Sequence, residues 1–147
     1  MTFSNFFSDY LGNIDWLDAI IGAVVIFAIG WIWYGPLFGK MWSKATGREM
    51  GSGMPDPMTM VKGFIEFFLF GLGVGLVFPA LHVTFQNPSS FETLLVTAFA
   101  VSFLIAAMPL FSRHVWEGGS LNLWLIDWGF WFVSAFAYGY VVLDLLA

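Results

Sequence analysis

The chain has 147 residues, of which 59% are hydrophobic and only 10% are charged, and its net charge is −5. Soluble domains carry about 25% charged residues because their surface must be solvated, so this composition excludes a conventional soluble enzyme and a disordered chain. The negative charge argues against nucleic acid as a partner. The absence of cysteine excludes disulfides and thiolate metal sites. We therefore expect a membrane protein whose partner is the lipid bilayer, with no cofactor, no metal and no enzymatic activity.

The residues before the first apolar run have an amphipathic pattern of their own. Aromatic and aliphatic side chains recur there at helical spacing from Phe3 to Ile14, with polar residues between them. This pattern predicts a short N-terminal helix that lies on the membrane interface. A continuous extension of the first span is the alternative, and Gly12-Asn13 favours a bend between the two.

Four apolar stretches are long enough to cross a bilayer, whose hydrocarbon core of about 30 Å needs roughly 20 helical residues. The predicted spans are residues 16–38, 63–82, 93–111 and 121–143, with a loop at 39–62. Their apolar runs show none of the strict alternation of a membrane β-barrel. The sequence therefore predicts one all-α membrane domain, residues 1–147, folded as a four-helix bundle.

The basic residues all fall on one side of this predicted bundle. They are Lys40, Lys44, Arg48, Lys62 and Arg113. The positive-inside rule makes that side cytoplasmic, because cytoplasmic loops carry the excess of Lys and Arg. Both termini are then outside, in a multi-pass protein of the cell membrane.

The two halves of the chain resemble each other. Residues 36–42 and 109–116 each end a span with a proline, a small residue, a base and a tryptophan. The span that follows has an acid near its start, Glu66 in the first half and Asp127 in the second. This pattern predicts two similar helical hairpins in a parallel repeat. Chance similarity between two aromatic-rich helix ends is the alternative.

Small residues predict where the helices pack. Lipid tails are as apolar as leucine, so spans associate where small side chains let their backbones approach. The predicted packing residues are Gly71, Gly75, Ala98, Ser102, Ala106, Ala135 and Gly139. The aromatic surface that remains leads us to expect a homo-oligomer or a subunit of a membrane complex.

Tryptophans gather in the half of the bundle that carries the bases. An interfacial belt explains this, because indole rings favour the headgroup level. The alternative is that Trp124, Trp128 and Trp131, which share a helix face, line an aromatic pocket or a subunit contact.

Glu66 and Asp127 are the main candidates for function. An ionised carboxylate at the centre of a span costs about 2.5–3.5 kcal/mol, so each acid needs a partner, a proton or water. The candidate cluster consists of Glu66, Asp127, Lys40, Lys62, Arg113 and Asn122. It is either a site that binds an ion or solute or relays protons, or a set of ion pairs that fix the helix ends.

Other potential ligands do not form a metal site. Four methionines between residues 50 and 60 could suit Cu(I), but they lie in a loop without Cys or His that we interpret as a Gly- and Pro-rich linker. His82 and His114 fall at opposite faces of the predicted bundle.

Residues Trp33 to Trp42, WYGPLFGKMW, resemble the hallmark Trp-Tyr, Pro-Leu, Phe-Gly-Lys and Trp stretch of a family of small bacterial membrane proteins. The family is known as domain of unknown function 1761. Residues 117–119, followed by 125–129, are similar to its second motif. The resemblance spans essentially the whole chain and implies a four-helix fold in the bacterial cell membrane, without an established activity. Asp127 stands where the family pattern has Asn, which argues against an essential ionised role.

Two functions remain open from the sequence. The paired acids and bases favour permeation or transport of a small solute or ion. The aromatic surface and the lack of catalytic groups favour a non-catalytic structural or accessory subunit of a membrane complex.

Overall fold

The computed structural model describes residues 16–48, 56–82 and 91–141, and all regular secondary structure in these ranges is helical. The predicted all-α class is confirmed. The predicted interfacial helix at the N-terminus lies outside the described residues. The elements are α2 (Trp16–Ile32), η1 (Trp33–Leu37), α3 (Gly39–Thr46), α4 (Pro57–His82), α5 (Phe91–Ser102), η2 (Phe103–Ala107), α6 (Met108–Glu117) and α7 (Leu121–Tyr140), where η marks a π-helix.

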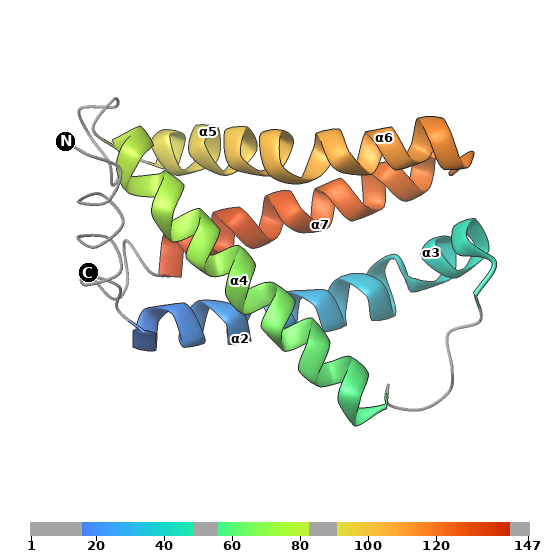
Figure 1. Ribbon diagram of the computed structural model, residues 1–147, viewed down its shortest axis with the longest axis horizontal. Helices are drawn as coiled ribbons and strands as arrows, with labels where there is room; N and C mark the ends of the chain where they lie inside the picture. The colour runs from blue at the N-terminus through green and yellow to red at the C-terminus, as the bar shows by residue number, and fades with distance from the viewer. Residues whose placement is uncertain (1–15, 49–55, 83–90, 142–147) are drawn as a thin grey trace.

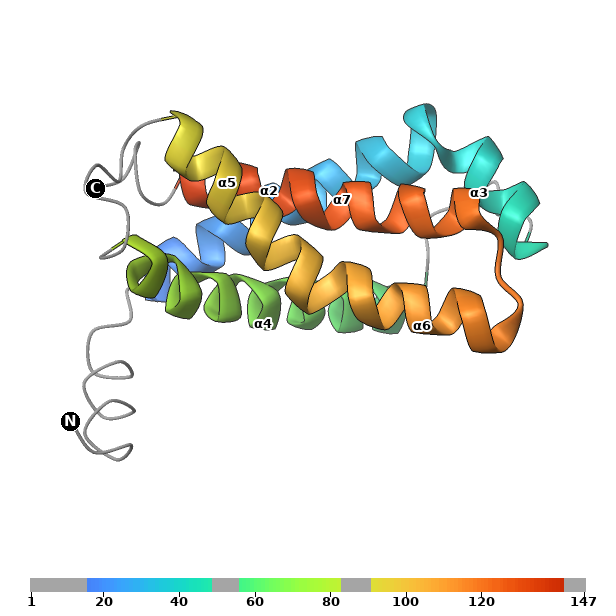
Figure 2. The ribbon, with the colours of Figure 1, turned by 90° about the horizontal axis from the view of Figure 1, so that it is seen from above.

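The long helical segments alternate in direction along the chain (Figure 1). α2–η1 and α5–η2–α6 run toward the end of the bundle where α3 lies, and α4 and α7 return from that end. α7 contacts α2, α4 and α5, and also α3 and α6. Figure 2 shows the same arrangement from above. α7 is therefore the helix around which the others pack.

Within residues 16–48, 56–82 and 91–141, three segments are long and apolar enough to cross a membrane: Trp16–Leu37, Pro57–Gly75 and Phe91–Glu117. The predicted fourth span, in α7, is not among them, because this helix contains Asp127, Asn122 and several Trp, Gly and Tyr residues. Its central place explains that composition, since a helix covered by neighbours needs fewer apolar side chains toward lipid. The number of four spans stays a prediction.

The observed helices begin and end at residues that differ from the boundaries of the predicted spans. α4 begins at Pro57 instead of residue 63, and the third segment continues to Glu117 instead of ending at 111. The predicted loop, residues 39–62, contains all of α3 and the first six residues of α4. α3 and α6 both end at a glycine with positive φ, Gly47 and Gly118, the conformation that a residue with a side chain rarely adopts.

A side-chain cap explains the early start of α4. The Asp56 carboxylate accepts hydrogen bonds from the backbone N–H groups of Met58 (2.9 Å) and Thr59 (3.1 Å) and from the Thr59 hydroxyl. Pro57, with its fixed φ and no N–H to satisfy, suits the first helical position. The Thr59 hydroxyl and these N–H groups hold the pKa of Asp56 below its usual value.

Both segments that run toward α3 contain a π-helical stretch near a proline. Pro36 has no N–H, and its ring would clash with the carbonyl four residues earlier in a regular α-helix. The wider winding of η1 avoids this, and the Phe38 N–H donates to the Trp33 carbonyl at 2.8 Å, five residues back. η2 ends two residues before Pro109. The two stretches are not placed identically relative to their prolines, so the repeat stays a prediction.

The core of the bundle consists of apolar side chains from every long segment. Its fully buried members are Ile26, Val74, Leu94, Val101, Phe130 and Tyr138. Six of the predicted packing residues, Gly71, Ala98, Ser102, Ala106, Ala135 and Gly139, are also buried, and Gly75 is half-buried.

The ring of Tyr138 on α7 lies directly against two glycines, Gly22 on α2 and Gly71 on α4. A Cβ atom at Gly22 would lie 2.1 Å from Tyr138 Cε2, and one at Gly71 would lie 2.8 Å from the same atom. Both distances are shorter than real Cβ contacts. The meeting of α2, α4 and α7 therefore requires glycine at these two positions.

We expect Gly71→Ala and Gly22→Ala to destabilise the protein by about 1–3 kcal/mol, with the larger effect at Gly22, because the new methyl group overlaps the Tyr138 ring. Gly73→Ala is the matched control on α4, since nothing lies within 4 Å of its added Cβ. Unfolding in detergent, followed by circular dichroism, measures the effect. An equal loss of stability in the control would contradict the role of Tyr138.

Candidate functional site

Two adjacent residues of η1 donate hydrogen bonds to two adjacent residues of α7. Trp33 Nε1 donates to the Ile126 carbonyl oxygen at 3.0 Å, and the Tyr34 hydroxyl donates to Asp127 Oδ1 at 2.9 Å. The Trp33 ring also lies against Gly129, where an added Cβ would be 3.0 Å from Trp33 Cζ2. The Trp-Tyr motif of the first segment and the 125–129 stretch of α7 thus form a single contact.

Aromatic packing fixes the Tyr34 hydroxyl in this position. The Tyr34 ring lies 5.2 Å from Phe130 and 6.1 Å from Trp42, measured between ring centroids. Asp127 is half-buried, about 9 Å along α7 from its first residue at 1.5 Å per residue. A carboxylate at this depth needs a donor, and Tyr34 is the donor that the fold supplies.

A hollow of about 450 Å³ between α3, α6 and α7 reaches Asp127, and we call it the Asp127 pocket. Its volume falls in the range of small-molecule sites, about 300–1,000 Å³. Both signs of charge line it. The ionisable lining residues are Arg48, Arg113, His114, Glu117 and Asp127, and the others include Trp42, Ala45, Thr46, Ser120 and Trp124.

Most polar groups around the Asp127 pocket already have partners. Arg113 Nε lies 3.3 Å from Glu117 Oε2 in an exposed ion pair, and Ser120 Oγ accepts the Leu123 N–H at 3.1 Å as the cap of α7. In the part of the chain that the structure describes, His114 Nδ1 is buried without a hydrogen-bond partner, and Tyr34 is the only group bonded to Asp127. The pocket therefore offers the second carboxylate oxygen of Asp127 to a bound molecule.

The structure divides the predicted cluster of six residues. Asp127 and Arg113 line the same pocket, and Arg113 is close enough to act electrostatically on Asp127. Asn122 is exposed in the first turn of α7 and does not line the pocket, and Lys40 lines a different hollow beside α3.

The two cluster members on α4, Lys62 and Glu66, are exposed and do not pair with each other. The only salt bridge among the described residues joins Arg113 to Glu117. α4 crosses the bundle at an angle, so its first turns diverge from α3 and α6 (Figure 1).

Tyr34 is the functional candidate that sequence reasoning missed, and His114 was considered there only as a metal ligand. The search concentrated on acidic and basic residues in the spans, and a tyrosine is neither. One signal was present: an acid inside a span needs a donor, and Tyr34 is a polar side chain predicted near the same end of the bundle as Asp127.

The three tryptophans of α7 pack inside the bundle. Trp124 and Trp128 stack with ring centroids 5.3 Å apart, and their indole N–H groups donate to the Ala107 carbonyl (2.9 Å) and to Ser102 Oγ (3.4 Å). Trp131 faces α4, where it lies 4.4 Å from the Phe70 ring. These rings hold α7 between its neighbours, and only Trp124 also lines the Asp127 pocket.

Comparison with models of known protein families shows which family the chain belongs to. The family model described as Protein of unknown function (DUF1761) matches residues 17–143. The chain belongs to this family. The predicted membership is thereby confirmed, and no curated protein and no solved structure matches the chain. The DUF1761 match contains both sides of the contact between η1 and α7.

We expect Tyr34→Phe and Asp127→Leu each to lower the free energy of unfolding. Their coupling energy should lie between about 0.6 kcal/mol, the average for hydrogen bonds between membrane helices, and about 1.7 kcal/mol, the largest such value. Asp127→Asn keeps the oxygen that accepts from Tyr34, so its stability stays close to that of the unmodified protein. A double-mutant cycle of unfolding in detergent gives the coupling. Tyr140→Phe, on an exposed tyrosine, is the control. Additive effects of Tyr34→Phe and Asp127→Leu would contradict the bond.

Proposed function

We propose that this DUF1761 protein binds a small polar solute or ion in the Asp127 pocket as the first step of its permeation or transport. The observation that supports this is a pocket of about 450 Å³ that leads from one end of the bundle to a carboxylate fixed by Tyr34. Ionisable residues within membrane helices are costly and mark solute or ion pathways by default. With the positive-inside rule, the pocket opens to the cytoplasm of a bacterial cell, and both termini are outside.

The inner end of the pocket, at Asp127, favours a cation or a solute that carries an amine. Tyr34 occupies one oxygen of Asp127, so the other can accept a hydrogen bond or pair with a positive charge. The Arg113–Glu117 pair near the mouth is exposed, and exposed pairs of this kind contribute only about 0–1 kcal/mol. This pair can therefore open for a solute at little cost.

Beyond Tyr34 the bundle is closed by aromatic side chains. Phe130 is 2% exposed, and its ring lies 5.6 Å from Phe67 and 5.1 Å from Trp131. A solute that reaches Asp127 passes further only if these rings move. The proposal is therefore gated movement of bound solute and not flow through a permanently open pore.

Flux into liposomes tests this proposal. We expect the purified protein to carry at least one of four probes, H⁺, Na⁺, K⁺ or methylammonium, and Asp127→Asn to lower that flux about tenfold or more. Glu66→Gln, which neutralises an exposed acid outside the pocket, should keep the flux within about twofold. No flux of any probe above that of empty liposomes, or equal flux in the Asp127→Asn variant, would contradict the proposal.

An accessory role in a larger membrane assembly is the second candidate, and Glu66 favours it. This exposed acid lies in the apolar segment Pro57–Gly75, next to the exposed side chains of Ile65 and Leu69. A carboxylate that faces hydrocarbon needs a partner, and a second subunit on this face of α4 could provide one.

Because the chain has no cysteine, single-cysteine variants test that face cleanly. We expect Leu69→Cys to form a cross-linked dimer, or a cross-link to a co-purified subunit, in native membranes. Leu104→Cys, at a strongly exposed position outside α4, is the control. A monomer in both variants, seen by gel electrophoresis without reductant, counts against a subunit contact on α4.

A further inference from the structure

α3 concentrates the positive charge of an otherwise acidic chain. Three of the five basic residues, Lys40 and Lys44 on α3 and Arg48 just after it, line one hollow of about 650 Å³, and no acidic residue lines it in the part of the chain that the structure describes. The net charge of the whole chain is −5. A surface with this local composition attracts anions.

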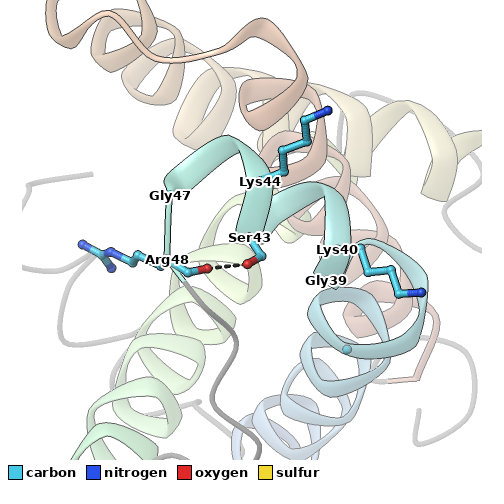
Figure 3. Close-up of a pocket in the computed structure, with 7 residues that line it drawn as sticks. Gly39, Lys40, Ser43, Lys44, Gly47 and Arg48 are labelled. Atoms are coloured by element: carbon cyan, nitrogen blue, oxygen red, sulfur yellow. Dashed lines mark hydrogen bonds between the residues drawn. The ribbon is translucent and has the colours of Figure 1, made fainter.

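The three basic side chains spread apart around the hollow. Figure 3 shows Lys40, Lys44 and Arg48 pointing in three different directions, while the Ser43 hydroxyl donates to the Arg48 carbonyl oxygen. Side chains arranged in this way do not converge on one small anion. They can instead each meet a different member of an array of anionic groups, which is what a bilayer surface presents.

Apolar side chains accompany the bases. Leu37 and Met41, at the junction with α3 and within it, are 59% and 50% exposed. A soluble anion would leave them in water, whereas the acyl chains of a lipid would cover them. The side chains of Trp42, Ala45 and Thr46 line the Asp127 pocket. The positions of α3 that face the protein interior are therefore different from those that carry the bases.

The position of α3 fits the headgroup layer. It begins at Gly39, directly after the segment Trp16–Leu37, which is long and apolar enough to span a membrane. A short helix with bases and apolar residues at such a boundary is typical of interfacial binding to anionic lipids.

We propose that α3 is a binding site for anionic phospholipids. Their phosphodiester groups contact Lys40, Lys44 and Arg48, and their acyl chains lie against Leu37 and Met41. Arg48 also lines the Asp127 pocket, but lipid binding at α3 does not depend on the function proposed for Asp127.

Native mass spectrometry of the full-length protein, titrated with phosphatidylglycerol or phosphatidylcholine, tests the site. We expect phosphatidylglycerol to bind at least about tenfold more tightly, because each base near the surface contributes about a fivefold gain in affinity. The double variant Lys40→Gln/Lys44→Gln should then lose about 25-fold in phosphatidylglycerol affinity. Lys62→Gln, on an exposed base of α4 outside the hollow, should change the affinity less than about twofold.

Two further measurements separate a lipid from a free phosphate. Met41→Gln should weaken binding of phosphatidylglycerol, and millimolar inorganic phosphate should not displace the lipid. Equal affinity for the two lipids, equal loss in Lys62→Gln, or displacement by phosphate with no effect of Met41→Gln would each overturn the proposal.

Discussion

The position of α7 depends on a contact in which Trp33 and Tyr34 donate hydrogen bonds to the Ile126 carbonyl and the Asp127 carboxylate. Polar groups buried in an apolar bundle cost several kcal/mol when they have no partner. The bond to the backbone of α7 fixes where Trp33 meets this helix, and the bond to Asp127 gives the carboxylate its donor. A rotation or a one-turn shift of α7 would break both bonds together. The wall of the Asp127 pocket is held in place by the same contact.

Pro36 links this contact to the shape of the pocket. It lies in the π-helical stretch that presents Trp33 and Tyr34, and the helix breaks two residues later at Phe38, where ψ is 0°. α3 starts anew after the break, and its Trp42, Ala45 and Thr46 form one side of the Asp127 pocket. An uninterrupted α-helix would lack this break. One imino acid thus accounts for both the donor to Asp127 and the opening beside it.

Features that depend on local sequence could be predicted. Apolar runs predicted the helical class, and the Trp33 to Trp42 motif predicted the family. The early start of α4 was missed because Asp56-Pro57, a good helix start, stands at the end of a Gly- and Pro-rich stretch that reads as linker. Lys62 and Glu66 were predicted to belong to the cluster that contains Asp127. Whether either residue would meet Asp127 depended on the crossing angle of α4, which no local pattern encodes.

The partner of Asp127 lies 93 residues away in the sequence, which is why no spacing rule could identify it. A row of glycine or alanine is visible within one helix, and six of the seven small residues singled out in this way are buried. Gly22 was nevertheless not singled out, since its role depends on Tyr138 of α7. In this fold, the sequence of a single helix indicates which of its faces packs. The neighbour that covers this face is determined only by the sequences of both helices together.

The side chain at position 127 has two separate tasks. One is structural, to accept the hydrogen bond from Tyr34, and the other is chemical, to present a polar group to the pocket. An asparagine at this position would present the same kind of oxygen to the Tyr34 hydroxyl and preserve the contact. Its remaining group would be an amide NH₂, which donates, where Asp127 has an oxygen that accepts. The packing of α7 is therefore compatible with either residue, but the inner end of the pocket is not chemically the same. A pocket that ends in Asp127 suits a cation or an amine, whereas one that ends in asparagine would suit a solute with a hydrogen-bond acceptor. The arrangement of the helices would be the same in both cases.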